Sequence, residues 1–508
     1  MNNSLEQQLW DSFHNLKKDR AIYNMGSDFK NYFLGIITYK YLSEKLEVYL
    51  NRELEQDKLT FREAWEDIKY KEVLNKASLD DLGYFIEPDY LFENVFLSDS
   101  RDLTYNLNYA LNLIGKSSLG HESEEDFANI FEDVNVDSTK LGKTVKERAE
   151  IIFKIMSEVN EIDFKVDDPD KNHLGKAYEY LISHLALESK KGANYTPLDL
   201  SVLLSRIISL ENKSFENVYD PCCGSASSLL VLNSCCEVKE MFAQEINRNT
   251  YNLARMNMIL HGIDFRKYDI ELGDCLEDPA HSDYKFDAIL SHPPFTSNWS
   301  ADKSFFDDER FASYSKLAPK SKPHLAFVQH MIYHLDDKGT MAVILPHGVL
   351  FRGASEGLIR SEIIEKNYLH AVIGLPSNLL YGTAIPVVVL VFKKSRENSD
   401  VLFIDASSDF EKDRFKNVLT DKHIDKIVDV LDNFKEIDHY SAVVSLDEIS
   451  ENRYNLHIPR YVDTFIPEES VDVDRLYKRL DEISDDLKDI NHKIDAKCDK
   501  LKIRKFSF

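Results

Sequence analysis

Two short stretches of the chain place reactive side chains beside residues that shape the backbone. The first, Asp220–Ser227, joins an acid to Pro, two Cys, Gly, Ser, Ala and Ser, and it follows Val218-Tyr219. The second, Ser291–Phe295, is Ser-His-Pro-Pro-Phe and follows another apolar run. Both have the pattern of a strand that runs into a loop, and the first loop runs into a helix.

The first stretch suits an adenosyl cofactor. A strand would bring Asp220 to the carboxyl edge of a sheet. The small residues Gly224, Ser225 and Ala226 let backbone amides approach a ligand closely. A helix that starts near Ser227 points its amide dipoles at the same place. By itself, such a turn is more often only a tight connection between a strand and a helix.

Two more acids follow at the ends of predicted strands. The strand Met241–Glu245 ends about twenty residues after the first loop, where Glu245 can accept hydrogen bonds from both ribose hydroxyls. The next strand and loop lie in Ile270–Leu276, where Asp274, beside Cys275, can accept a hydrogen bond from an adenine amino group. The sequence therefore predicts three acids at the ends of successive strands, which together indicate a cofactor site.

The second stretch carries a resemblance to known enzymes. Amino-methyltransferases of DNA use an Asn/Asp/Ser-Pro-Pro-aromatic tetrapeptide, and His292–Phe295 is similar to it. Four further segments match one such family in the family's order: Gly192–Pro197, Leu345–Phe351, Gly374–Pro386 and Asn452–Tyr461. From roughly Leu9 to Ile503, the chain resembles the modification subunit of a type I restriction–modification system, an adenine-N6 DNA methyltransferase.

The resemblance implies S-adenosylmethionine as the cofactor and a set of site residues. The catalytic residues would be His292, Pro293, Pro294 and Phe295. The cofactor would contact Ala193, Asn194, Tyr195, Thr196, Pro197, Leu198, Asp220, Gly224, Ser225, Ala226, Ser227, Glu245, Asp274 and Cys275. Residues 193–198 would lie over its methionine end. Without the resemblance, this segment predicts only a helix start, with Thr196 as the N-cap and Pro197 in the first turn.

His292 departs from the family, in which this position is Asn. In the family, an amide oxygen and a proline carbonyl accept both hydrogens of the adenine amine, and the aromatic ring, here Phe295, stacks on the extruded base. A neutral imidazole has one acceptor nitrogen, whereas a protonated one has none and repels the cationic methyl donor. We expect His292 to weaken or abolish methyl transfer. The alternative is that His292 accepts the hydrogen bond and activity survives. Ala226, at a Gly-like position of the family, is a milder change.

The order of predicted elements indicates an α/β fold with a doubly wound, mainly parallel, Rossmann-like methyltransferase sheet. Strands are predicted at 215–220, 240–245, 268–273, 286–291, 341–346, 369–374 and 386–393. We expect an N-terminal all-α domain (1–165), an S-adenosylmethionine-dependent methyltransferase domain (166–395), an appended C-terminal region (396–467) and a coiled-coil tail for subunit assembly (468–508).

Three regions outside the sheet have distinctive patterns. The N-terminal region repeats apolar residues at helical spacing, as in Phe29–Leu42. The segment between Thr296 and Pro323 is a long polar loop with aromatic residues, for which we expect a lid or a DNA-facing element. The tail repeats Leu and Ile at alternating spacings of four and three over Leu476–Leu501, which favours either a partner helix or a helix packed on its own protein.

Composition restricts the function classes. No apolar run is long enough to span a membrane and the N-terminus lacks a signal-peptide pattern, so we expect a cytoplasmic protein with no membrane partner. The six cysteines include two adjacent pairs rather than metal-binding spacings, so we expect no metal. The net charge of −26 is unusual for a protein that binds DNA. Basic residues must therefore be localised, or another subunit must supply phosphate contacts.

The chain also lacks room for a recognition domain, because only about 115 residues follow Lys394 and the last third of them is coiled coil. The resemblance implies double-stranded DNA with an adenine target, a separate specificity subunit, a second copy of the modification subunit and, in some systems, a restriction or translocase subunit. Two other functions stay open. One is a catalytically silent cofactor-binding module that scaffolds a specificity subunit, and the other is methylation of cytosine N4 or of an amine outside DNA.

Overall fold

The computed structural model describes residues 4–99, 101–167, 173–188, 195–464 and 473–504. The chain divides into two units, Met1–Asp463 and Thr464–Phe508. The second unit begins close to the residue at which we expect the coiled-coil tail to start. The divisions that we expect within the first unit, near residues 165 and 395, remain predictions.

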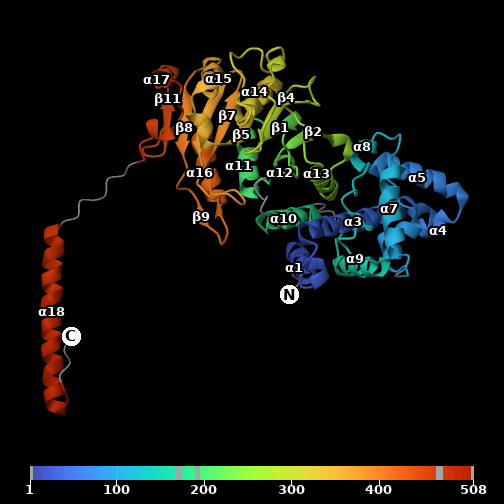
Figure 1. Cartoon of the computed structure of the whole chain (residues 1–508), viewed down its shortest axis with the longest axis horizontal. Helices are drawn as coiled ribbons and strands as arrows, with labels where there is room; N and C mark the ends of the chain where they lie inside the picture. Colours follow the sequence, from blue (N-terminus) through green and yellow to red (C-terminus); the bar gives the residue numbers. More distant parts are fainter. Residues whose placement is uncertain (1–3, 100, 168–172, 189–194, 465–472, 505–508) are drawn as a thin grey trace. The chain divides into compact units, whose positions relative to one another are not determined.

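The described part of the N-terminal region is helical (Figure 1, blue to cyan). Its α-helices are α1 (Leu5–Lys17), α2 (Arg20–Tyr23), α3 (Phe29–Glu53), α4 (Phe61–Trp65), α5 (Ile68–Leu82), α6 (Phe92–Phe96), α7 (Leu103–Ser117), α8 (Glu124–Phe127) and α9 (Val145–Asn160). The long helix α3 is buried over most of its first half, since apolar side chains occupy all its sides from Phe29 to Leu42. The helical spacing of this segment therefore correctly predicts a helix, and its burial is a finding of the structure.

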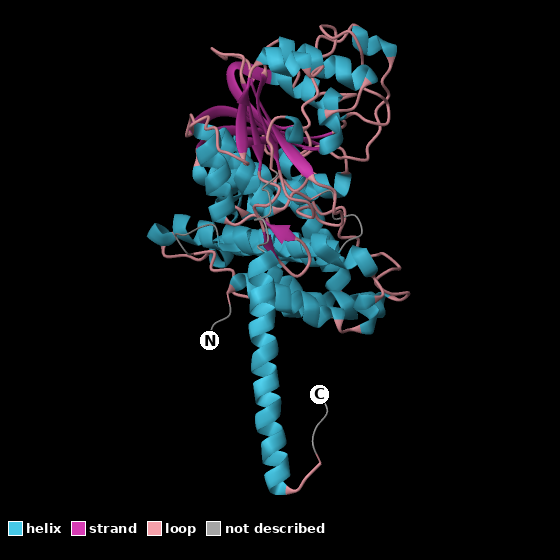
Figure 2. Cartoon of the chain, turned by 90° about the vertical axis from the view of Figure 1, so that its left-hand side faces the viewer, coloured by secondary structure: helices cyan, strands magenta, loops and turns pink. Residues whose placement is uncertain are grey.

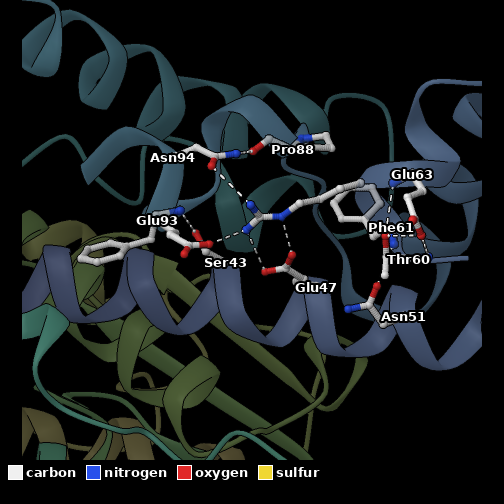
Figure 3. Close-up of polar contacts among 11 residues, drawn as sticks. Ser43, Glu47, Asn51, Thr60, Phe61, Glu63, Pro88, Glu93 and Asn94 are labelled. Atoms are coloured by element: carbon white, nitrogen blue, oxygen red, sulfur yellow. Dashed lines mark hydrogen bonds and ion pairs between the residues drawn. The ribbon is translucent and has the colours of Figure 1, made fainter. Parts of the chain in front are cut away.

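Arg62, in α4, joins three helices of this region. Its guanidinium donates hydrogen bonds to Glu47 of α3 (2.7 and 3.4 Å), to Glu93 of α6 (2.7 Å) and to Asn94 (3.4 Å). Figure 3 shows the side chains of Glu47, Glu93 and Asn94 turned toward this shared donor. Because the ion pairs are partly exposed, we expect them to fix the helix arrangement more than to add stability.

The sheet region contains all seven predicted strands. They are β1 (Ser214–Asp220), β2 (Glu237–Glu245), β3 (Tyr268–Leu272), β4 (Phe286–Ser291), β5 (Leu335–Pro346), β6 (Leu369–Gly374) and β7 (Val387–Lys393). The full sheet has nine strands in the order β11-β8-β6-β7-β5-β4-β1-β2-β3. Strand β7 runs antiparallel to both of its neighbours, and β1 to β5 pair in parallel. The predicted doubly wound, mainly parallel sheet is thus confirmed.

Alternate residues of the strands point to opposite faces of the sheet and belong to two separate hydrophobic cores, one on each face. Val218 of β1 packs on one face, and Tyr219 packs on the other. The first face is covered by α11 (Leu198–Ile208), α12 (Ser227–Cys235), α13 (Arg248–Leu260) and α16 (Asp421–Asp432). The second is covered by α14 (His324–His334), α15 (Ala354–Glu365) and α17 (Leu446–Glu451). Figure 2 shows the strands (magenta) flanked by helices (cyan).

Residues 396–467, which we expect to form an appended region, extend this same sheet. Strand β8 (Val401–Asp405) pairs in parallel with β6, and β11 (Ser441–Val444) pairs antiparallel with β8. The region also contains the small hairpin of β9 (Glu411–Lys412) and β10 (Asn417–Val418). The strands predicted from the sequence do not include β8 and β11, which have five and four residues.

The helical region and the sheet region share a hydrophobic core. Leu253, Met256 and Ile259 of α13 belong to the same buried cluster as α1, α3 and α9. Beside them, the buried Arg255 donates hydrogen bonds to the backbone carbonyls of Glu125 (2.6 Å) and Ala128 (2.9 Å). Helix α13, which follows β2, is therefore anchored in the helical region.

The second unit contains helix α18 (Val473–Leu501). Its leucines and isoleucines at positions 476, 480, 483, 487, 490 and 501 are at least half exposed. The stripe predicted from the sequence is therefore present along a continuous helix. Of the helices in the described part of the chain, none combines the length and the apolar character needed to cross a membrane.

Candidate active site

Asp220 ends β1 with its side chain buried. Its Oδ1 accepts hydrogen bonds from Ser291 Oγ (2.7 Å), at the end of β4, and from the backbone N–H of Cys222 (3.0 Å). Burial raises the pKa of Asp220 to about 7, because the two neutral donors offset the loss of hydration only in part. Since β1 and β4 are neighbours, this contact joins the two stretches that the sequence singled out.

Glu245 ends β2, the neighbour of β1 on its other side. Its carboxylate accepts hydrogen bonds from the backbone N–H groups of Gly224 (3.1 Å) and Asn247 (2.7 Å). Burial raises the pKa of Glu245, and the backbone donors act in the opposite direction. The carboxylate thus reaches the loop after β1, and two of the three predicted acids lie at the same edge of the sheet.

Asp274 and Cys275 follow β3, the next strand along. Asp274 Oδ1 accepts a hydrogen bond from the N–H of Leu276 (2.9 Å), which closes a turn. The N–H of Gly273 donates to the carbonyl of Glu245 (3.0 Å), and this bond ties the turn to the end of β2. The Cys275 thiol and burial raise the pKa of Cys222 well above its ordinary value. The loops after β1 and β3 therefore meet across the end of β2, which lies between these strands in the sheet.

The loop after β1 has an unusual backbone. Gly224 and Ala226 both lie in the left-handed region, with φ of +58° and +62°. Glycine adopts this conformation freely, whereas alanine does so at a cost of about 1–2 kcal/mol. The hydroxyls of Ser225 and Ser227 lie 2.8 Å apart, and α12 begins at Ser227 as predicted. Ala226, at the family's Gly-like position, is thus held in a strained conformation.

The segment before α11 corrects one prediction. Helix α11 begins at Leu198 with Pro197 as its N-cap, and no side chain caps it, so the assignment of Thr196 as the N-cap is wrong. Thr196 Oγ1 instead lies 3.2 Å from Nδ1 of His292. A local capping rule could not anticipate a partner that is distant in sequence. Ala193 and Asn194 lie outside the described residues, and Tyr195 lies 5.8 Å from the Lys30 ammonium.

His292 follows β4 with its ring partly buried. Burial lowers the pKa of His292 to about 4, so the imidazole is neutral near neutral pH. The expected repulsion between a protonated ring and a cationic methyl donor is therefore absent at that pH. What remains is a ring with one donor nitrogen and one acceptor nitrogen. Nδ1 contacts the Thr196 hydroxyl. If the ring proton is on Nδ1, Nε2 can accept a hydrogen bond, and if the proton is on Nε2, this nitrogen can only donate one.

The remainder of the tetrapeptide surrounds this ring. Pro293 is buried, and Pro294 and Phe295 are partly exposed. The Phe295 ring meets His292 edge to face, with centroids 5.1 Å apart and planes at 71°. It also lies 6.2 Å from the ring of His324, at the start of α14. Phe295 is therefore held in place by neighbouring rings and retains exposed surface for stacking.

The loop between Thr296 and Pro323 differs from the expected lid. Trp299, Phe311 and Tyr314 are buried and belong to the core on the second face of the sheet. The buried Arg310 donates hydrogen bonds to the carbonyls of Cys275 and Leu276 (both 2.8 Å). These contacts anchor the loop to the Asp274 turn. Its aromatic side chains serve mainly as core, which a list of residue types cannot distinguish from a DNA-facing surface.

Two polar residues beside the loop after β1 were not among the predicted site residues. Glu179, on α10 (His173–Glu188), accepts hydrogen bonds from Ser227 Oγ at 2.9 and 2.8 Å. Asn257, on α13, donates from Nδ2 to Glu179 and to the carbonyl of Ser225 (2.8 Å). Each residue is a single polar position among apolar residues of a helix. This sequence pattern does not indicate a functional site.

A cavity of about 610 Å³ lies next to these groups, between the helical region and α13. Its lining includes Tyr195 and Asn247 from the sheet region, and Lys17 and Lys30 from the helical region. Asp220, Glu245 and His292 are outside this lining. The cavity therefore adjoins the predicted site and does not coincide with it.

Two family models match the chain. Residues 169–470 match the N-6 DNA methylase family, and residues 5–159 match the HsdM N-terminal domain. Together, the two ranges cover the sheet region and the helical region described above.

Individual relatives give the same result. The methylase subunit of the type I restriction enzyme MpnII from Mycoplasma pneumoniae is 35% identical, over 97% of this chain and 95% of that protein. The HindI methylase subunit from Haemophilus influenzae is 32% identical, over 58% of this chain and 69% of that protein.

Among solved structures, a type I restriction–modification methyltransferase subunit from Streptococcus thermophilus superposes with a TM-score of 0.83 and 38% identity, over 91% of this chain and 99% of that one. A modification subunit from Vibrio vulnificus, at 17% identity and a TM-score of 0.59, shares the fold. The chain therefore belongs to the N-6 DNA methylase family, among the methylase subunits of type I restriction enzymes.

Proposed function

We propose that this chain transfers a methyl group from S-adenosylmethionine to N6 of adenine in double-stranded DNA, within a complex whose sequence recognition comes from a specificity subunit. The single observation that carries the proposal is the 3.2 Å contact between Thr196 and His292. It brings the segment that matches the family's cofactor site against the residue that matches its catalytic Asn. Methyl transfer requires the methyl group of the cofactor and the target amine to be held next to each other.

The residues that would hold the cofactor form the cofactor half of the site: Tyr195–Leu198, Asp220, Gly224–Ser227, Glu245, Asp274 and Cys275. Acids at three adjacent strand ends, and small residues before a helix, fit a nucleoside with a charged amino-acid tail. Glu245 would accept hydrogen bonds from the ribose, and Asp274 would accept one from the adenine amine. The bound cofactor supplies a methyl group on a sulfonium centre, which is already activated for transfer.

The acceptor half consists of His292–Phe295. An adenine in a duplex must leave the helical stack to reach this turn, where Phe295 provides a face for stacking. If His292 carries its proton on Nδ1 and donates it to Thr196, Nε2 is free to accept a hydrogen bond from the target amine. In the other tautomer, Nε2 is a donor and opposes that amine. Only one of the two neutral forms therefore suits the reaction.

A share of the protein in the unsuitable tautomer, together with the different shape of the imidazole, lowers the rate that we expect relative to an Asn at this position. Positioning accounts for much of the barrier in such transfers, so a small displacement of the amine is costly. We therefore propose a protein that binds its cofactor and methylates slowly. The first alternative, a catalytically silent scaffold, differs from this proposal only in the complete absence of transfer.

Methylation of DNA by the reconstituted complex separates these functions. The complex with its specificity subunit is incubated with radiolabelled S-adenosylmethionine and a cognate duplex, and the modified nucleoside is identified by mass spectrometry. N6-methyladenine supports the proposal. N4-methylcytosine supports the second alternative, and no product from a complex with confirmed binding of cofactor and DNA supports the scaffold. A complex without the specificity subunit controls for unspecific transfer.

Assembly is proposed from α18. A stripe of exposed leucines and isoleucines at heptad spacing suits a coiled coil with a specificity subunit. The net charge of −26 is unfavourable for contacts with DNA phosphates. We propose that such contacts come in part from the specificity subunit, a second modification subunit and a restriction or translocase subunit. The expected cytoplasmic location belongs to this proposal, since the DNA substrate lies there.

Deletion of the residues after Pro467 tests the assembly role. We expect the first unit to remain folded and to lose co-purification with the specificity subunit. A variant with Lys488→Ala and Lys493→Ala, which alters exposed charges of α18 and keeps the stripe, is the control. Full stoichiometry in the truncated complex would mean that α18 has no role in this assembly.

A further inference from the structure

Glu179 stands where three helices meet beside the loop after β1. It lies on α10, and both of its carboxylate oxygens accept hydrogen bonds from Ser227 Oγ, at the first residue of α12. Asn257 of α13 donates from Nδ2 to the same carboxylate and to the carbonyl of Ser225. The carboxylate is therefore fixed in position from two sides, against the residues that match the family's cofactor loop.

The charge of Glu179 has only neutral partners in the described part of the chain. Its hydrogen-bond donors are a hydroxyl and an amide, and it forms no ion pair with any described residue. Burial raises the pKa of Glu179, and the Asn257 and Ser227 donors offset this in part. Asp199, on the adjacent α11, differs because Lys416 pairs with it at 3.1 Å. A carboxylate withdrawn from water without a cation is unfavourable until a cation reaches it.

We infer that Glu179 binds the α-ammonium group of the methionine end of S-adenosylmethionine. This rests on the proposed cofactor half of the site, in which Tyr195–Leu198 and the start of α12 surround the methionine end. An ammonium has three N–H donors, and a carboxylate has lone pairs left after its bonds to Ser227 and Asn257. The resulting hydrogen bond is charge-assisted on both sides, which makes it stronger than those of the neutral donors. The sulfonium carries charge without an N–H donor and cannot form it.

A merely structural role would have a different signature. A carboxylate beside the first residue of a helix also interacts favourably with the helix dipole. If Glu179 only supported α12, its replacement would disturb the whole loop, and every ligand of the loop would lose affinity. If it binds the ammonium, only ligands that carry the ammonium lose affinity.

Calorimetry on the full-length chain with three ligands separates these roles. S-adenosylmethionine has both an ammonium and a sulfonium, S-adenosylhomocysteine has only the ammonium, and methylthioadenosine has neither. We expect Glu179→Gln to weaken the first two by about tenfold and to leave methylthioadenosine unchanged. Glu237→Gln, at an exposed position at the start of β2, is the matched control and should change none of them.

Three results would overturn the inference. Equal losses for all three ligands would assign Glu179 to support of the loop. A loss confined to S-adenosylmethionine would assign it to the sulfonium. Unchanged affinities would remove it from the site, whereas the proposed cofactor half would stand. If the unaltered protein bound none of the ligands, the cofactor half and this inference would both fail.

A second measurement needs no variant and covers the case in which Glu179→Gln does not fold. The unaltered protein is titrated with S-adenosylhomocysteine and with its deamino analogue, which keeps the carboxylate and lacks the ammonium. We expect about tenfold weaker binding of the deamino analogue. Equal affinity of the two ligands would contradict ammonium recognition and with it the role of Glu179.

Discussion

The cofactor half and the acceptor half of the site are built differently. In the cofactor half, Asp220 and Glu245 receive hydrogen bonds from backbone amides at the ends of neighbouring strands. In the acceptor half, which follows β4, the rings of His292 and Phe295 pack edge to face. The first half matches its family apart from Ala226, and the second departs from it at the residue that would hold the substrate. Binding of the donor and transfer of the methyl group can therefore change independently.

A contact between two predicted site residues links the halves. Thr196 belongs to the cofactor half and lies 3.2 Å from the imidazole of His292. An Asn at position 292 would have a shorter side chain with a carbonyl oxygen and an amino group in place of the ring. The hydrogen bond between Ser291 and Asp220, which joins the two strands beneath this ring, does not involve the side chain at position 292.

The largest effect that we expect in the cofactor half follows from Glu245→Ala. The change removes a carboxylate that would accept ribose hydrogen bonds and that now holds the N–H of Gly224. Affinity for S-adenosylmethionine should fall by about 1–3 kcal/mol, measured by calorimetry. Glu237→Ala, on the exposed end of the same strand, is the control. Unchanged affinity in a folded Glu245→Ala variant would remove Glu245 from the site.

A smaller effect concerns pH. The pKa of Asp220 is about 7, so the carboxyl ionises between about pH 6 and about pH 8. S-adenosylmethionine carries a net positive charge and prefers the ionised form, so its affinity should rise by about tenfold as pH rises through this range. Asp220→Asn keeps an acceptor for Ser291 and should flatten the rise. A pH profile that is equally steep in both proteins would assign the titration to another group.

The smallest effect tests the contact between the halves. A double-mutant cycle with Thr196→Val and His292→Phe removes the hydroxyl and the ring nitrogens separately and together. Denaturant unfolding should give a coupling energy of about 0.5–1.5 kcal/mol, as for one hydrogen bond between neutral groups. Effects that add within about 0.3 kcal/mol would show that the two residues do not interact in solution.

Regular elements were the most predictable part of this fold. Val387–Lys393 and Phe286–Ser291 are nearly continuous apolar runs, as buried parallel or central strands require, so their positions are evident from the sequence. Strands β8 and β11 were not predicted, although β8 is as long as β3 and contains the apolar run Val401–Ile404; β11 has only four residues. The sequence also places acids at or just after the ends of three successive strands, and in the structure β1, β2 and β3 are neighbours in the sheet.

Long-range polar contacts were the least predictable part. Thr196 has the sequence of an N-cap, yet its hydroxyl meets a ring that lies far away in sequence. Arg310 in the expected lid binds carbonyls of the Asp274 turn, and Glu179 meets Ser227 across two helices. Each of these contacts depends on the direction of a side chain after packing, which local residue patterns do not encode.

Single-turnover methylation of a cognate duplex tests the central claim most directly. The reconstituted complex with His292 is compared with the complex that carries His292→Asn, at saturating S-adenosylmethionine and with DNA binding confirmed for both. We predict that His292→Asn raises the rate by about tenfold or more, since about 1.4 kcal/mol of barrier corresponds to that factor, while cofactor affinity stays the same. Equal rates in the two complexes would contradict the account, because imidazole would then serve as well as carboxamide.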